Sequence, residues 1–593
     1  MNKRLGAVVV VALLAMEGLM LPLAATNAAS GDSVRMSVST DKYTYPLVGT
    51  VTATISVTNL EPETLSGLTI NTTVYDPANV EVLAFPLIKA GSIGALTTTD
   101  FNVSTSFSLS DENYLIVSTA SFNGTQVGLA SVPLVVLSTN GRAPLTLAMV
   151  FHMHQPIYLN LQGQFEQPWV QVHSGSDFQD NGTWYGAYLW HVVMLETHPD
   201  IHVTFNLQPS LLYQWNVTMT DFKYNSTFSA YPGGQAEMQR DLAAVNATVA
   251  GYRSLAADGQ AEILTSPFYH PLSAILVQLG FSSDLLAQIE LGKNYTDQFM
   301  GVQAQGMWTP EMGFTMGMVP IMQEAGIKYT VLDGKYHFSG ASGPGGSESM
   351  YQPFELDGAN GSHIIVFFRD TEISDNLTSV WNSIPNSRVA ASDFIAAVAN
   401  VYRSNPGGVL TIASDGENPI ALGDGLVSAL DFNAIYGAIE SSQSWLQTST
   451  LGSIVANHTA PARLTFVPTN SWSGGLGLWI GNPSKTAIWE AIISARKTLV
   501  NLTSQYGANN PEIKKLWNYL YIAEGSDWEW QTPTGPAWFA MQGYRYAAAA
   551  SQYVAPTVSV TRQASPYLLY AEVSAGIAIA AAAVLVAWQR RKH

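Results

Sequence analysis

The sequence predicts an α/β protein, in which a βα-barrel is preceded by an all-β sandwich and followed by a helical domain. Three observations support this fold class. Short alternating segments fill residues 33–138, apolar runs alternate with helical patterns over residues 145–425, and the rest is largely helical. The chain has 593 residues, which is too long for one domain of the usual 100 to 200 or so.

The first domain is expected at residues 30–139. Its segments alternate apolar and polar residues and are divided by turn residues, which is typical of an immunoglobulin-like β-sandwich. The segments are Val51–Val57, Leu68–Val74, Phe101–Phe107 and Leu115–Ser121. The region has no cluster of histidines and carboxylates, so we interpret it as a spacer or binding module.

The second domain, residues 145–425, begins with Leu145–Phe151, an apolar run typical of a strand buried on both faces. Helical patterns such as 236–257 and 392–403 separate the later strands, and this alternation predicts a parallel sheet closed into a barrel. Those strands are expected at Ile201–Leu207, Glu262–Thr265, Tyr329–Leu332, Ile364–Phe368 and Val409–Ala413. Helical patterns at 429–447, 485–506 and 511–522 then predict a helical domain over residues 426–555.

The two ends of the chain predict where it works. Residues 1–29 combine two basic residues, an apolar stretch and several alanines, as in a secretory signal peptide; an uncleaved anchor is the alternative. Residues 567–588 are mostly apolar and precede the basic tail 589–593, which predicts a transmembrane helix with a cytoplasmic tail. We therefore expect an extracellular glycoprotein anchored to the cell membrane, with Asn-x-Ser/Thr acceptors from Asn71 to Asn501.

Composition narrows the function. Asp and Glu number 44 against 26 Lys and Arg, a net charge of −18, and no basic stripe is present, so we expect no nucleic-acid partner. The absence of cysteine excludes disulfides, thiolate catalysis and Cys-ligated metals. A sparsely charged, aromatic-rich chain suits a neutral polar ligand such as a sugar, and it equally suits a protein that works in acid.

Residues that could take part in catalysis or ligand binding follow the predicted strands, and the ends of the strands are where barrels have their active sites. His152 and His154 point the same way if the first strand continues, and they could bind a metal ion or sugar hydroxyls. Glu311 lies among aromatic and Met residues, where burial can tune its pKa, and Trp308 could stack on a sugar ring; a helix-capping Glu is the alternative. Asp415 follows the strand that ends near residue 413.

Two carboxylates from different strands are what cleavage of a glycosidic bond needs. One acts at the anomeric carbon while the other protonates the leaving oxygen. Asp415 and Glu417 would share one face of an extended segment. Their surroundings lack the twelve-residue calcium-loop pattern with its distal Glu.

Four motifs in order resemble glycoside hydrolase family 57, closest to its amylopullulanase and α-amylase branch. They are HQP at 154–156, GQAEI at 259–263, WTPE at 308–311 and DGENP at 415–419. The resemblance extends from residue 145 to about 550. It implies a (β/α)7 barrel, a helical C-terminal domain that completes the active site, and retaining cleavage of α-glucans such as starch, glycogen and pullulan-like polymers.

Carried over residue by residue, the resemblance implies Glu311 as the nucleophile and Asp415 as the general acid/base. Residues that match positions binding the glucose ring are His152, His154, Glu262, His270, Trp308, Glu417, Asp527 and Trp530. Trp472, beside a glycine-containing loop, is a further candidate for the cleft. We expect no required cofactor and no catalytic metal, and a structural calcium ion stays open. The segment 528–535 departs from the family pattern, which leaves the α-1,4 or α-1,6 preference open.

Three alternative functions fit the same residues. A 4-α-glucanotransferase would use the same pair with a sugar hydroxyl in place of water. A metal-dependent barrel enzyme would hold a divalent ion with His152, His154 and Asp177. A non-catalytic cell-surface polysaccharide-binding protein would keep the barrel without turnover, although Glu311 and Asp415 are both present.

Overall fold

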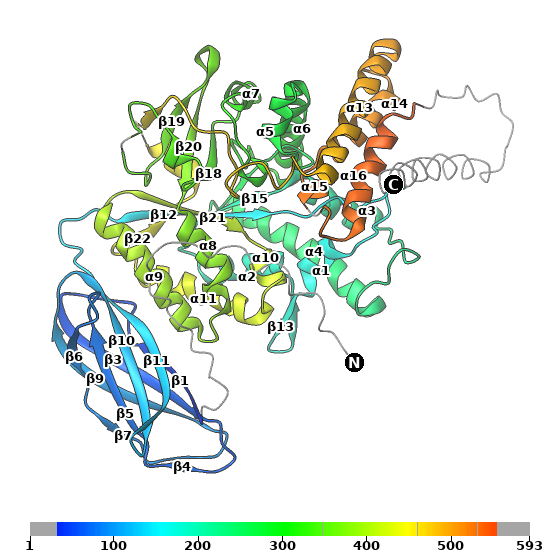
Figure 1. Ribbon diagram of the computed structural model, residues 1–593. Helices are drawn as coiled ribbons and strands as arrows, with labels where there is room; N and C mark the ends of the chain where they lie inside the picture. Colours follow the sequence, from blue (N-terminus) through cyan, green and yellow to red (C-terminus); the bar gives the residue numbers. More distant parts are fainter. Residues whose placement is uncertain (1–32, 347, 459–460, 531, 554–593) are drawn as a thin grey trace, which may run out of the picture.

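The computed structural model describes residues 33–346, 348–458, 461–530 and 532–553 (Figure 1). The expected signal peptide and C-terminal transmembrane helix lie outside these residues. Within the described residues, no helix combines the length and apolar character that a membrane crossing requires.

Two mostly antiparallel sheets form the N-terminal domain (Figure 1). One sheet contains β1 (Val34–Thr40), β3 (Val48–Asn59) and β9 (Thr98–Ser108). The other contains β2 (Thr44–Tyr45), β11 (Thr125–Val136), β10 (Glu112–Phe122), β5 (Thr69–Tyr75), β6 (Glu81–Ala84) and β7 (Ile88–Lys89). A further short pair is β4 (Leu65–Ser66) with β8 (Ser92–Ile93). Alternate residues of β3 and β10 are buried in one apolar core, so the predicted β-structure is confirmed, while the immunoglobulin-like assignment stays a prediction.

The β-domain rests on one helix of the barrel, α9 (Ser387–Ser404). Arg403 donates from Nε to Asp111 Oδ1 at 2.8 Å and from Nη2 to the carbonyl of Val136 at 3.0 Å. Arg388, at the start of α9, donates to the carbonyl of Thr40 at 2.8 Å. These contacts place the β-domain beside α9, away from the C-terminal helices (Figure 1).

Seven parallel strands form the barrel and follow one another around it in chain order. They are β12 (Leu145–Met153), β15 (Val203–Leu207), β16 (Ala261–Leu264), β17 (Gly306–Met307), β18 (Tyr329–Asp333), β20 (His363–Arg369) and β21 (Val409–Asp415). The ring closes just beyond β16, where the N–H of Trp308 donates to the carbonyl of Thr265 at 2.9 Å. The seven-stranded barrel that the family resemblance implies is therefore present.

Side chains fill the inside of the barrel. Apolar residues such as Val150, Leu264 and Phe367 form a separate interior cluster. At the N-terminal ends of the strands, α12 (Leu451–Asn457) adds Leu451 and Ile454 to this cluster and so covers that end of the barrel. A substrate is therefore expected at the C-terminal ends of the strands.

Helices and short strands surround the barrel. They are α1 (Trp169–Gly175), β13 (Phe178–Asp180), β14 (Thr183–Tyr185), α2 (Ala187–Thr197), α3 (Pro209–Asp221), α4 (Gly234–Ala257), α5 (Ser273–Gln278), α6 (Ser282–Met300), α7 (Met318–Glu324), β19 (Phe354–Asp357), α8 (Thr371–Ser379), α10 (Asn418–Ala421), α11 (Gly425–Glu440), β22 (Leu446–Thr448) and β23 (Ala462–Leu464). The expected helix 429–447 ends at Glu440, because Leu446–Thr448 pair with the start of β12 as a strand. Helix α11 packs on α9 and α2, so it belongs to the helical layer of the barrel.

Three later helices, α13 (Pro483–Tyr506), α14 (Pro511–Ala523) and α16 (Ala537–Ala550), pack against one another, with the short α15 (Asp527–Trp530) beside them. Helices α13 and α14 each start with Asn-Pro, in which the Asn side chain caps the helix and the Pro has the φ of a first turn.

Glu166, in the loop after β12, fixes α16 to the barrel. Its Oε2 accepts hydrogen bonds from Trp538, Gln542 and Arg545 at 2.9–3.0 Å. The short helix α15, which precedes α16 in the chain, is thereby held against the barrel, and its first residue reaches His154 at the end of β12.

Candidate active site

Most of the predicted site residues meet at the C-terminal end of the barrel strands. His152 lies near the end of β12, in register with Asp415 at the end of β21. Glu311 follows β17, and His270 follows β16. Four separate strands therefore deliver side chains to one place, as barrel enzymes require.

Glu311 occupies a strained turn. Its backbone has φ 59° and ψ 19°, the left-handed region that residues with a Cβ avoid at a cost of about 1–2 kcal/mol. The turn is closed by the N–H of Met312 on the carbonyl of Thr309 and by the N–H of Gly313 on the carbonyl of Pro310, both at 2.8 Å. The geometry lifts the Glu311 carboxylate out of the path of the strand.

Both oxygens of Glu311 accept a hydrogen bond. Trp472 Nε1 donates to Oε2 at 2.9 Å, and Ser526 Oγ donates to Oε1 at 2.8 Å. The N–H of Trp472 also donates to the carbonyl of Glu311 at 3.2 Å, which anchors the turn itself. Burial raises the pKa of Glu311 to about 7, against the opposing effect of these two hydrogen bonds.

Asp415 ends a regular strand. Its Oδ2 accepts from Asn418 Nδ2 at 2.8 Å. Burial raises the pKa of Asp415, and Asn418, His154 and Arg369 oppose the rise. Arg369 contacts the same strand, because its Nη1 donates to the carbonyl of Ala413 at 2.9 Å.

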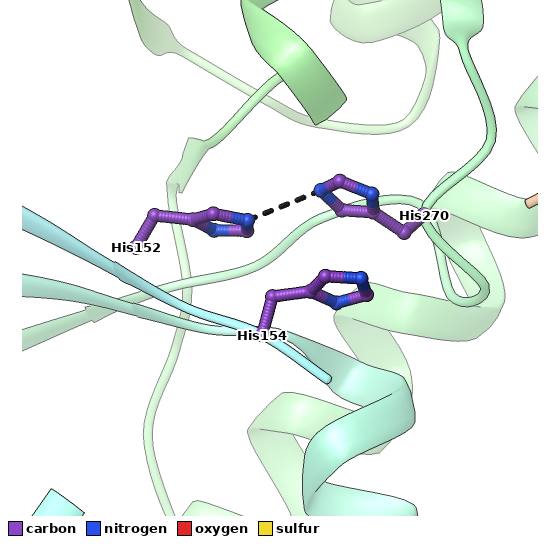
Figure 2. A group of neighbouring side chains, drawn as sticks. All are labelled: His152, His154 and His270. Carbon is purple, nitrogen blue, oxygen red and sulfur yellow. Dashed lines mark hydrogen bonds between the residues drawn. The ribbon is translucent and has the colours of Figure 1, made fainter. Parts of the chain in front are cut away.

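Three histidines, His152, His154 and His270, lie close together at this end of the barrel (Figure 2). The rings of His154 and His270 are stacked with centroids 3.9 Å apart, and His152 Nε2 lies 3.1 Å from His270 Nε2. On its other side His152 lies parallel to Trp308, with centroids 4.9 Å apart. Trp308 is only 4% exposed, so it supports His152 and does not present the open face that stacking on a sugar would need.

Each histidine has a different anchor. His152 Nδ1 lies 2.7 Å from Asn206 Oδ1, His270 Nδ1 lies 3.0 Å from Ser526 Oγ, and His154 Nε2 lies 2.8 Å from Asp527 Oδ1. Burial lowers the pKa of His152 to about 3 and lowers that of His270 well below its usual value. Burial also acts to lower the pKa of His154, but nearby carboxylates, first of all Asp527, raise it overall.

The spacing of the three imidazoles would allow a metal ion, because their ligand nitrogens lie within 4.8 Å of one another. Asp177, expected as a third ligand of a metal site, does not join them: its carboxylate accepts from the N–H of Ala187 at 2.8 Å and faces His173 at 2.7 Å. Within the described residues, His154 Nδ1 is the one nitrogen of the three imidazoles that is buried without a hydrogen-bond partner. The other imidazole contacts form a hydrogen-bonded chain, which suits proton transfer and sugar binding.

Glu417 lies next to this group. Its Oε1 accepts from the N–H of His154 at 3.4 Å, while its Oε2 is buried without a partner among the described residues. Burial raises the pKa of Glu417 well above its usual value, and Asp415 adds to the rise. A protonated Glu417 can donate a hydrogen bond to a bound hydroxyl.

Two C-terminal tryptophans differ in role. Trp472 is 37% exposed, but its indole N–H is engaged by Glu311. Trp472 therefore positions Glu311, the candidate nucleophile. Its place beside a glycine-containing loop had suggested a position in the substrate cleft and not this contact. Trp530 lies on α15, three residues after Asp527, and is 38% exposed.

Glu262 is the predicted site residue that the structure separates from the others. Its carboxylate accepts from Thr204 Oγ1 at 3.0 Å, from the N–H of Gly452 at 2.9 Å and from the hydroxyl of Tyr329. Gly452 belongs to α12, which covers the N-terminal end of the barrel. Glu262 therefore lies at the N-terminal end of the barrel, opposite to the carboxylate pair, and joins β16 to α12.

Sequence patterns did not single out Ser526, Asn206 or the buried pair of Arg369 and Asp333, whose Nε and Oδ2 are 2.8 Å apart. Ser526 directly precedes Asp527, which the family resemblance implies at the glucose ring, and this neighbour is the one signal that pointed toward it. Asn206 lies within residues 205–211, which also resemble the family. Arg369 ends a barrel strand, where polar residues are candidates by position alone.

Comparisons with known proteins agree with this geometry. Residues 148–422 match the model of glycosyl hydrolase family 57. Over 116 residues the chain is 33% identical to an α-amylase of Pyrococcus horikoshii and 34% identical to a 4-alpha-glucanotransferase of Thermococcus litoralis. These stretches are 20% of this chain but only 17% and 16% of those proteins.

Solved structures support the fold. An α-amylase of Thermotoga maritima has a TM-score of 0.53 at 14% identity, over 68% of this chain and 92% of that one. A family 57-type branching enzyme of Pyrococcus horikoshii has a TM-score of 0.51 at 17% identity, over 68% and 87%. The ordered motifs, the seven-stranded barrel and the family match agree with one another: residues 148–422 of this chain are similar to glycosyl hydrolase family 57.

Proposed function

We propose that this protein cleaves α-glucans with retention of configuration, with Glu311 as the nucleophile and Asp415 as the general acid/base. One observation carries the proposal. Two buried carboxyl groups follow different strands at the C-terminal end of a barrel that matches family 57, and donors hold both oxygens of one of them. Relatives named α-amylase support α-glucan as the substrate class.

In the first step, protonated Asp415 donates its proton to the glycosidic oxygen while ionised Glu311 attacks the anomeric carbon. Water then attacks the glycosyl-enzyme, and Asp415 takes the proton from that water. Burial raises the pKa of Asp415, which favours the protonated form that the first step needs.

The buried polar groups around the pair would bind the glucose ring at the cleavage point. His154 pairs with Asp527 through Nε2, and Glu417 accepts from the N–H of His154 through Oε1. Their other polar atoms, His154 Nδ1 and Glu417 Oε2, are buried without a partner among the described residues. A hydroxylated ring can therefore form hydrogen bonds with these two atoms that an apolar ligand cannot.

Transglycosylation is the second candidate, because a relative of equal similarity is named a 4-alpha-glucanotransferase. A sugar hydroxyl would then replace water in the second step, with the same two carboxylates. Chromatography of the products from maltoheptaose separates the two, since a transferase makes longer chains while hydrolysis makes only shorter ones.

We also propose that the protein works outside the cell, attached to the membrane by residues 567–588. The apolar run and the basic tail support this location. Fractionation of cells and protease treatment of intact cells test it, since an external enzyme would sediment with membranes and be digested.

The deciding experiment measures new reducing ends released from soluble starch and from pullulan by the full-length protein in mild detergent. Glu311→Gln, which keeps the shape of the side chain, is the matched control. Release that disappears in Glu311→Gln would establish the activity and show which polymer is preferred. Absence of release by the wild-type protein from both polymers, together with no transfer products, would refute the proposal.

A further inference from the structure

Glu311 stands at one end of a continuous chain of hydrogen-bonding groups. Ser526 Oγ lies 2.8 Å from Glu311 Oε1 and 3.0 Å from His270 Nδ1. His270 Nε2 lies 3.1 Å from His152 Nε2, and His152 Nδ1 lies 2.7 Å from Asn206 Oδ1. The chain thus connects the proposed nucleophile to the inside of the barrel through one serine of the C-terminal region.

Asn206 fixes the direction of the chain at its inner end. Its Nδ2 donates to the carbonyl of Thr265 at 3.0 Å, so its Oδ1 faces His152. His152 Nδ1 must therefore carry a proton. If His152 is neutral, its Nε2 is an acceptor, and His270 Nε2 must donate to it.

One more proton is needed than the neutral groups hold. Each of the four contacts in the chain requires one proton, whereas the hydroxyl of Ser526 and two neutral imidazoles supply only three. The additional proton lies on Glu311, which then donates to Ser526, because burial lowers the pKa of both imidazoles and disfavours a cation there.

We propose that Ser526 is a positioning residue that joins the Glu311 carboxylate to the His270–His152 pair and so controls when the nucleophile loses its proton. While Glu311 is protonated, its Oε1 donates to Ser526 Oγ, Ser526 Oγ donates to His270 Nδ1, and His270 Nε2 donates to His152 Nε2. When Glu311 loses this proton to solvent, the Ser526 hydroxyl turns to donate to the carboxylate, which can then attack. Both imidazoles stay neutral, because burial lowers their pKa values. The inference rests on the proposed role of Glu311.

Two other titratable groups, Asp527 and His154, change the pKa values of the groups in this hydrogen-bonded chain. Asp527, on α15, raises the pKa of Glu311, while His154 lowers it. His154 also lowers the pKa of both His152 and His270. A substrate that draws Asp527 or His154 toward its hydroxyls would therefore change how readily Glu311 loses its proton.

Infrared difference spectroscopy of the full-length protein tests the inference without turnover. The carbonyl band of protonated Glu311 is the band missing from Glu311→Gln, and it should titrate near pH 7 in the wild-type protein. Ser526→Ala removes a donor to the carboxylate, so the midpoint should rise by about one pH unit. Ser526→Thr keeps the hydroxyl and should restore the midpoint. Ser428→Ala, which removes a buried hydroxyl from α11, is the matched control and should not move it.

The outcomes separate this inference from the proposed function. An unchanged or lower midpoint in Ser526→Ala, or no Glu311 band at any pH from 5 to 9 or so, would overturn the link. If Ser526→Ala does not fold, Ser526→Cys serves instead, because a thiol of similar size is a weaker donor and should also raise the midpoint. A protein that shows these shifts but releases no sugar would keep the link and lose the proposed function.

Discussion

The two carboxylates proposed for catalysis are held in opposite ways. Asp415 ends a regular strand, and its hydrogen-bond donor Asn418 lies three residues further along the chain. Glu311 lies in a left-handed turn, and its donors Trp472 and Ser526 follow 161 and 215 residues later. Local sequence therefore places the acid/base, whereas the nucleophile depends on the C-terminal region. That region lies beyond residue 422, where the family match ends.

The largest expected effects are those of replacing the two carboxylates, and they should distinguish the nucleophile from the general acid/base. Glu311→Gln should reduce kcat on starch by about 10⁴-fold or more, since the nucleophile is lost. Asp415→Asn should reduce it by about 10²–10⁴-fold. On an aryl α-glucoside whose leaving group needs no proton, Asp415→Asn should recover its first step, seen as a burst of released phenol, and Glu311→Gln should not. Equal behaviour of the two variants on that substrate would contradict the assignment.

The hydrogen bond that Trp472 donates to Glu311 from outside the barrel should affect kcat, and Trp472→Phe tests this. This variant keeps the aromatic ring but removes the indole N–H from Glu311 Oε2. Loss of a hydrogen bond to a charged group should reduce kcat by about 10–100-fold with a smaller change in KM. Asn418→Ala is the comparable change at Asp415. A purely substrate-binding role for Trp472 would instead raise KM and leave kcat intact.

The pH profile should follow from the two raised pKa values. Glu311 attacks only when ionised, so kcat/KM should rise with pH up to about 7. Asp415 must be protonated, so kcat/KM should fall as pH exceeds its raised pKa. Asn418→Ala removes a donor to the Asp415 carboxylate and should move the alkaline limb to higher pH. An acidic limb centred near 4.5, the ordinary value for Glu, would show that Glu311 is not the group observed.

The smallest kinetic effect is expected at the opposite end of the barrel. Glu262→Gln should leave kcat/KM within about threefold of wild type, because Glu262 contacts Thr204, Tyr329 and α12 and not the carboxylate pair. It should lower the free energy of unfolding by about 1–2 kcal/mol through a weakened buried network. A large rise in KM without loss of thermal stability would contradict this structural role and indicate that Glu262 binds the substrate.

Much of the site was predictable because barrel geometry brings strand ends together. His152 and Asp415 each follow an apolar run, and parallel strands put such positions at one end of the barrel. Glu311 follows no such run and was identified from its WTPE motif. Glu262 was misplaced for a related reason: it lies near the beginning of its short strand β16, so it faces the closed end. The role of Trp472 could not be predicted, since its contact with Glu311 depends on how a distant loop folds back.

By itself the sequence determined the order of the β-rich, barrel and helical regions, six of the seven barrel strands and the residue types at their ends, because periodicity and motif order are local properties of the chain. Only the tertiary structure decided which donors hold Glu311, that Trp308 supports a histidine, and that Ser526 connects the carboxylate to the imidazoles. The physical reason is distance along the chain. Hydrogen bonds between residues hundreds of positions apart depend on packing of whole helices, such as α16 against the loop after β12, which no local pattern encodes.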